Sequence, residues 1–146
     1  MKSSMKCIRR HKDAVLPSRA HSKDVGYDLT AISKYKTLEN GVILFDTGLG
    51  VSPPEGYYFE IVPRSSISKT GWMLANSIGT LDPGYTGNLY IALVKVVPDA
   101  PEPSLPFTKC QLVLRKAHYC DVKEVDSLTD TERGIGGFGS TGDRNT

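Results

Sequence analysis

Four short stretches of the sequence carry side chains that could bind a phosphate or activate a water molecule. The first, PRSS at residues 63–66, places an arginine and two hydroxyls directly after an apolar, aromatic segment. Arg64 could pair with a phosphate, and the backbone amides of a helical turn at Ser65 and Ser66 could bind the same anion. The same residues would also form an ordinary turn that ends a strand, and the sequence leaves both interpretations open.

The second stretch, NSIGTLDPGYTG at residues 76–87, predicts a β-hairpin whose returning arm carries Asp82. Asp82 could act as a general base on a water molecule, and Tyr85, after a Pro-Gly turn, could pack against a sugar. Asn76 offers an amide donor and acceptor that suit one hydrogen-bonding edge of a base. Aspartate before Pro-Gly is also a common turn former, so a purely structural role is the alternative.

The third stretch, VGYDLTA at residues 25–31, holds a single carboxylate, Asp28, between apolar neighbours. Asp28 could be a buried, hydrogen-bonded structural acid. It could also act on a metal ion that is bound to phosphate. Its neighbours do not decide between these roles.

The fourth stretch, RGIGGFGSTG at residues 133–142, is half glycine. Its Gly-x-Gly-x-x-Gly spacing matches the dinucleotide-binding fingerprint, which requires a strand before it, a helix after it and an acidic residue about twenty positions further on. Only four residues follow Gly142, and no lysine precedes Ser140 and Thr141 as a Walker loop requires. Both phosphate-loop interpretations therefore fail.

Two interpretations of this glycine stretch remain. One is a flexible tail, which is a common use of glycine. The other is a segment that wraps a nucleotide. In that case Arg133 supplies charge for phosphate, unshielded backbone amides bind oxygens, and Phe138 supplies a ring for the base.

The rest of the chain predicts an all-β protein. Helical periodicity is nearly absent, and the strongest segments are short, rich in β-branched and aromatic residues, and separated by Pro/Gly turn signals. These predicted strands cover residues 42–51, 56–62, 88–97 and 110–117. Short strands without helices between them are typical of a barrel or a sandwich. A helical turn is expected after Arg64 or around Val125.

Hydrophobic patterning stops at Thr131. A chain of 146 residues fits one domain. We therefore expect one β domain, residues 1–130, and a C-terminal arm, residues 131–146, that is flexible unless something docks it.

Composition and charge exclude few functions. The net charge of +2 argues neither for nor against nucleic acid, and the basic run at residues 6–12 is expected to be a solvated face. Cys7, Cys110 and Cys120 form no metal-binding or redox pair, and the sequence shows no apolar signal segment or membrane-spanning run. We expect an intracellular protein, cytoplasmic or nuclear, with reduced thiols and no nucleic-acid or membrane partner.

Taken in order, these stretches resemble the five sequence motifs of the trimeric dUTPases (deoxyuridine triphosphatases). VGYDL is similar to the first motif, PRSS to the second and NSIGTLDPGYTG to the third. KCQL around Gln111 resembles the core of the fourth motif, and RGIGGFGSTG matches the fifth at essentially every position. The resemblance runs from about Val25 to Gly142, and five motifs in this order are far more specific than any one alone.

The resemblance implies a fold, an activity and a cofactor. The fold would be a single-domain distorted β-barrel or jelly-roll-like β-clip, assembled as a homotrimer whose active sites are shared between subunits. The activity would be hydrolysis of dUTP to dUMP and pyrophosphate, which limits uracil incorporation into DNA. Mg2+ would be held by the three phosphates and water, and Asp28 would act on it through water only.

The same resemblance implies roles for individual residues. Asp82 would activate the water that attacks the α-phosphorus, and Tyr85 would leave no room for a 2′-hydroxyl. Uracil would be read by Asn76 and by the backbone of its hairpin, including Gly79. Phosphate oxygens would be held by Arg64, Ser65, Ser66 and Gln111. In the arm, a lid supplied by another subunit, Phe138 would stack on uracil. The outer phosphates would be gripped by Arg133, Gly137, Gly139, Ser140 and Thr141.

One stretch departs from the family pattern. The fourth motif commonly reads Gly-Asp-Arg-Ile-Ala-Gln, and here it reads PFTKCQ (residues 106–111) after a proline-rich insertion. Thr108 stands at the arginine position. The loop geometry at this point and one trimer contact are left open, whereas Gln111 is in place.

Two rival classes are open. A dCTP deaminase shares the fold and a similar RSS…DPGYxG pattern, but its glutamate base would fall at Ala92, and no acid occurs between Gly87 and Val97. The other rival is a binding or regulatory module that kept the fold and lost the chemistry. Such a module would typically have lost one of four residues that are all present here, namely Asp82, Tyr85, Arg133 and Phe138.

Overall fold

The computed structural model describes residues 3–139, and within that range the regular structure is ten β-strands and one short 3-10 helix, η1. The expected all-β fold is confirmed. The elements are β1 (Lys6–Arg9), β2 (Gly26–Ala31), β3 (Ser33–Thr37), β4 (Ile43–Asp46), β5 (Leu49–Ser52), β6 (Tyr57–Pro63), η1 (Ser65–Lys69), β7 (Trp72–Leu74), β8 (Gly79–Leu81), β9 (Tyr90–Lys95) and β10 (Phe107–Lys116). Between residues 3 and 139, no helix is long and apolar enough to cross a membrane.

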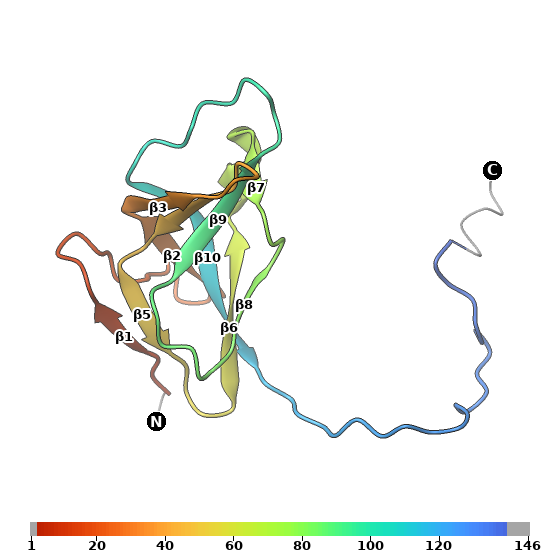
Figure 1. Ribbon diagram of the computed structural model, residues 1–146. Coiled ribbons are helices and arrows are strands. Elements are labelled where there is room, and N and C mark those ends of the chain that lie inside the picture. Colours follow the sequence, from red (N-terminus) through yellow and green to blue (C-terminus); the bar gives the residue numbers. More distant parts are fainter. Residues whose placement is uncertain (1–2, 140–146) are drawn as a thin grey trace.

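The strands form three antiparallel sheets in a jelly-roll-like arrangement (Figure 1). Two sheets have four strands, in the orders β2-β10-β6-β8 and β3-β4-β9-β7, and the third pairs β1 with β5. Within the described residues the ladders remain three separate sheets rather than closing into one barrel. The sheet β2-β10-β6-β8 carries most of the candidate residues.

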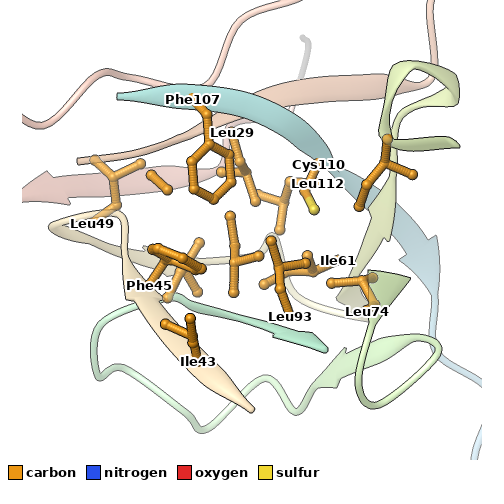
Figure 2. Packing of buried hydrophobic residues seen from close by; sticks show 14 of the residues in the cluster. Leu29, Ile43, Phe45, Leu49, Ile61, Leu74, Leu93, Phe107, Cys110 and Leu112 are labelled. Atoms are coloured by element: carbon orange, nitrogen blue, oxygen red, sulfur yellow. The ribbon is translucent and has the colours of Figure 1, made fainter. Parts of the chain in front are cut away.

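The core lies between the two four-stranded sheets, and side chains from both point toward one another in Figure 2. Phe45 of β4 meets Phe107 of β10 edge-to-face, with ring centroids 4.9 Å apart. Phe107 and Cys110 both face this core although strict alternation would place them on opposite faces, because a β-bulge shifts the register between them. Burial raises the pKa of Cys110 to about 12, so its thiol stays protonated and packs as an apolar group.

Several predicted elements are confirmed and three details are corrected. The helical turn after Arg64 is η1, whereas the residues around Val125 are not helical. The predicted strand over residues 42–51 is two strands, because Gly48 turns the chain with φ +70° between β4 and β5.

The third correction concerns the predicted hairpin at residues 76–87. β7 and β8 flank its first turn but do not pair with each other: β7 pairs with β9, and β8 pairs with β6. Each arm extends a different sheet, so the segment is a crossover between sheets. The turn residues in the sequence specify a reversal of the chain, but they do not specify which strand each arm joins.

The chain after β10 leaves the body of the protein (Figure 1). The last strand ends at Lys116, and residues 117–139 contain no further strand or helix. Several apolar side chains in this segment are fully exposed, among them Val122, Ile135 and Phe138. The extended segment therefore begins before residue 131, where the sequence pattern placed the start of the arm.

Candidate active site

Arg64, at the end of β6, is held by three contacts. Its Nε lies 3.2 Å from Oδ1 of Asp28 on β2, and its Nη1 donates to the carbonyl oxygen of Thr108 at 2.8 Å. Its backbone N–H donates to the carbonyl oxygen of Lys109, also at 2.8 Å. The side chains of Arg64 and Asp28 are 38% and 32% exposed, so the guanidinium is fixed yet open to a ligand.

Gln111 lies in the middle of the same sheet edge. On β10 it stands opposite Asp28 of β2 on one side and Val62 of β6 on the other. Its Nε2 donates to the carbonyl oxygen of Pro63 at 3.1 Å. A Cβ atom at Gly26 would overlap the side-chain amide of Gln111, so only glycine leaves that amide its place.

The two serines of PRSS follow on η1. Ser65 is exposed, and its carbonyl oxygen accepts a hydrogen bond from the Ser68 hydroxyl at 2.7 Å. The Oγ of Ser66 is buried and has no hydrogen-bond partner among the described residues. Buried hydroxyls without partners are uncommon, which marks this position as one where a ligand oxygen or a water molecule is expected.

Five of the predicted residues thus gather at one sheet edge, and we name them the arginine cluster: Asp28, Arg64, Ser65, Ser66 and Gln111. Thr108 supports this cluster and was not predicted to do so. Its hydroxyl lies 2.8 Å from that of Thr30 on β2, and its carbonyl oxygen accepts from Arg64. The departure from the usual fourth motif therefore leaves Arg64 and Gln111 tied to β10.

A second group lies on the crossover, which we name the carboxylate segment (residues 76–88). Asp82 and Tyr85 line a pocket of about 300 Å³ together with Thr80, Leu81, Asn88 and Tyr90. The backbone N–H of Tyr85 donates to the carbonyl oxygen of Asp82 at 3.0 Å, which closes the Asp-Pro-Gly turn. The Asp82 side chain is exposed, so water reaches its carboxylate.

Tyr90 in this pocket was not predicted either. Burial, followed by the charge of nearby Asp46, raises the pKa of the Tyr90 phenol, which therefore stays protonated at neutral pH. Alternation along β9 could have found it, because the buried Ile91 faces the core and so places Tyr90 on the opposite face.

Asn76 is exposed in the turn between β7 and β8 and does not line the Asp82 pocket. Gly79 follows it and stands opposite Ile61 of β6. A Cβ atom at Gly79 would lie 3.2 Å from the Asn76 amide nitrogen and 3.3 Å from the Ile61 Cβ, so glycine keeps this passage open.

The arginine cluster and the carboxylate segment lie at opposite ends of β6. Leu81 pairs with Phe59, so Asp82 lies beside Tyr58, with which it lines a common pocket. Arg64 is six positions further along the extended chain, which corresponds to about 20 Å. One chain therefore does not bring Arg64 and Asp82 to the same phosphorus atom.

The arm residues are not brought to either region (Figure 1). The Nε of Arg133 donates to the carbonyl oxygen of Gly136 at 2.7 Å, within a turn of the arm itself. Phe138 is fully exposed with φ +47°, and Gly137 and Gly139 on either side also have positive φ. Ser140 and Thr141 lie outside the described residues.

Within residues 3–139, no three His, Cys, Asp or Glu side chains gather closely enough to hold a metal ion by themselves. Asp28 is the carboxylate at the arginine cluster. A single carboxylate suits an ion such as Mg2+, which keeps several waters and takes other oxygens from substrate phosphates.

The fold and these two regions define an all-β protein with a fixed arginine cluster at one sheet edge and a carboxylate-lined pocket at another. The chain belongs to the dUTPase family, because the family model for dUTPase matches residues 12–142. That range contains every candidate residue.

Curated relatives agree with this assignment. A deoxyuridine 5'-triphosphate nucleotidohydrolase from Picosynechococcus is 33% identical over 94% of this chain and 98% of its own length. One from Corynebacterium glutamicum is 33% identical, over 96% of this chain and 95% of its own length. Among solved structures, the Staphylococcus bacteriophage 80alpha dUTPase G164S mutant with dUpNHpp has a TM-score of 0.78 at 23% identity, covering 96% and 99% of the two chains, which supports the fold.

Proposed function

We propose that this chain hydrolyses dUTP to dUMP and pyrophosphate. The observation that carries the proposal is the position of Asp82 and Tyr85 in one open pocket of a chain from the dUTPase family. Among solved relatives, the phage 80alpha enzyme was crystallised with the analogue dUpNHpp. The family's substrate therefore suits the residues found here.

Asp82 is the general base in this proposal. Its exposed carboxylate takes a proton from a water molecule as the water oxygen bonds to the α-phosphorus. The bond from the α-phosphorus to the oxygen shared with the β-phosphorus breaks, and pyrophosphate leaves with the electron pair. No covalent enzyme intermediate is needed, because positioning and charge neutralisation do the work.

The arginine cluster holds the phosphate oxygens. Arg64 supplies a guanidinium already oriented by β2 and β10, and the Gln111 amide lies beside it. The unpartnered hydroxyl of Ser66 and the exposed hydroxyl of Ser65 supply further donors. Donors fixed before the substrate arrives lose little in reorganisation when charge develops.

Mg2+ is the proposed cofactor. The phosphates and water would hold it, with Asp28 acting through water, and it would neutralise charge on the phosphates. The paper structure of a phage phi11 dUTPase mutant describes a structural Mg(II) ion in that protein. Here the single carboxylate at the arginine cluster supports the same kind of ion.

The active site is proposed to be shared within a homotrimer. The separation of about 20 Å between Arg64 and Asp82 on one chain supports this, since a nucleotide at Asp82 would need the arginine cluster of a neighbour. Asn76 and the Gly79 backbone would read uracil, and Tyr85 would pack under the sugar. A third chain would supply the arm, whose ligand-binding residues are Arg133, Gly137, Phe138, Gly139, Ser140 and Thr141.

The test is pyrophosphate release from dUTP, dCTP and UTP measured side by side with Mg2+ present. The proposal predicts fast release from dUTP alone, in amounts equal to the dUMP formed. Ammonia release from dCTP would instead identify a deaminase. No turnover of any of the three by a folded chain would leave only a binding module and would contradict the proposal.

A further inference from the structure

The loop that carries Tyr85 is held from outside by Arg10. This residue follows β1, and its backbone N–H donates to the carbonyl oxygen of Gly48 at 2.7 Å. Its guanidinium makes two bonds to the loop: Nη1 donates to Oδ1 of Asn88 at 3.0 Å, and Nη2 donates to the carbonyl oxygen of Thr86 at 2.7 Å. Because the guanidinium is a rigid planar fork, two such bonds fix the loop in both position and orientation.

Asn88 is the node of this network. Its Nδ2 donates to both carboxylate oxygens of Asp46, at 3.1 and 3.2 Å. Asp46 is itself fixed, since its Oδ1 accepts from the backbone N–H of Gly48 at 2.7 Å. The Asn88 amide thus lies between a group that only donates, Arg10, and a group that only accepts, Asp46, so its orientation is determined.

Tyr85 depends on the same node. Its hydroxyl donates to the carbonyl oxygen of Asn88 at 2.6 Å. A Cβ atom at Gly87 would lie 2.6 Å from the Tyr85 hydroxyl, so the ring lies tightly against the loop backbone. Anything that moves Asn88 will therefore move the Tyr85 ring.

We propose that Arg10, acting through Asn88, is a positioning residue that fixes the Tyr85 ring and so sets the discrimination between deoxyribose and ribose. The inference rests on the proposed function, in which Tyr85 packs under the sugar. Steric exclusion of one hydroxyl depends on placing the ring to within a fraction of an ångström, and a loosened loop would admit the extra atom. Arg10 itself does not line the Asp82 pocket.

The test compares kcat/KM for dUTP and for UTP in variants of the full chain. Arg10→Ala should raise the UTP-to-dUTP ratio of kcat/KM by about tenfold. Arg10→Lys should restore only part of the discrimination, because an ammonium cannot span both acceptors as a guanidinium does. Asn88→Asp keeps the side-chain size but sets a carboxylate against Asp46, and it should raise the ratio as Arg10→Ala does.

The matched control is Arg9→Ala, one position away on β1. Arg9 makes one long bond, 3.4 Å to the Ala14 carbonyl oxygen, and none to the loop. Its ratio should equal that of the wild type. A merely structural role for Arg10 would lower the melting temperature and leave the ratio unchanged.

The outcomes separate this inference from the proposed function. If the wild-type chain turns over dUTP and Tyr85→Ala raises the ratio, an unchanged ratio in Arg10→Ala and Asn88→Asp overturns the inference alone. An unchanged ratio in Tyr85→Ala also overturns it, because no discriminating ring would remain to be positioned. Absence of dUTP turnover by the wild-type chain overturns the proposed function and the inference together.

Discussion

The two ends of strand β6 differ in how their side chains are held. At the Arg64 end, the guanidinium and the Gln111 amide are already bonded to β2, β6 and β10. At the other end, the Asp82 carboxylate is exposed on a loop, and the nearby Tyr85 ring is fixed only through that loop. One region is a prepared anion cradle, and the other is an open surface.

This difference teaches how the work is divided. A fixed cluster of donors can bind phosphate without rearranging, whereas an exposed carboxylate stays in water until another surface encloses it. Because about 20 Å separates the two ends on one chain, enclosure by a second chain is the simplest way to join them. The predictions below perturb the exposed end, the arm and the held end in turn.

The largest effect is expected at the exposed end. Asp82→Asn keeps the side-chain shape and the turn but cannot accept the proton of the attacking water, so kcat should fall by roughly 10²–10⁴. The KM for dUTP and the melting temperature should change little, because the side chain is exposed. A kcat within about fivefold of the wild type would remove Asp82 from the role of base.

The next effect concerns the arm. Deleting residues 131–146 should lower kcat/KM by about 10², the loss expected when preorganised donors to phosphate charge are removed. The melting temperature measured by calorimetry should stay nearly unchanged, since Ile135 and Phe138 are fully exposed and contribute nothing to the core. A large drop in melting temperature would show instead that the arm stabilises the fold.

A smaller effect is expected at the held end. Gly26→Ala places a methyl group where the Gln111 amide lies, so Gln111 must move and kcat/KM should fall by about tenfold. In a Gln111→Ala background, the same Gly26→Ala change should have less than about a twofold effect, because the displaced amide is gone.

The control for Gly26→Ala is the double-mutant cycle itself. If the two substitutions lower kcat/KM additively, Gly26 acts through something other than Gln111. The cycle thus tests directly whether the arginine-cluster end of the sheet depends on its close packing.

The sequence predicted the strands and the turn at PRSS because those signals are local. Alternating apolar residues and Pro/Gly turns lie within a few positions of one another, as in β6 and η1. Family motifs also selected the residues of the arginine cluster, which the structure brings together.

Features that depend on distant pairing could not be predicted. The support from Thr108 requires a bulge in β10 and a hydroxyl contact with Thr30, 78 positions away. The hairpin prediction failed for the same reason, since Gly79 pairs with Ile61 rather than with its local neighbour strand. The network of Arg10, Asn88 and Asp46 likewise joins three segments that share no local pattern.

The central claim is that the two ends of β6 act on one nucleotide only when they come from different chains. Mixing an Asp82→Asn chain with an Arg64→Met chain tests it most directly, after each is shown to fold and to be nearly inactive alone. Once the subunits have exchanged, sites that join the intact Asp82 of one chain to the intact Arg64 of another should restore up to about a quarter of wild-type turnover.

The matched control mixes the Asp82→Asn chain with a chain that carries both substitutions, and it should stay inactive because no chain offers an intact Asp82. Recovered dUTP turnover in the first mixture alone is the result that this account predicts. Demonstrated subunit exchange with no recovery would mean that Asp82 and Arg64 of the same chain act together, and it would contradict the account.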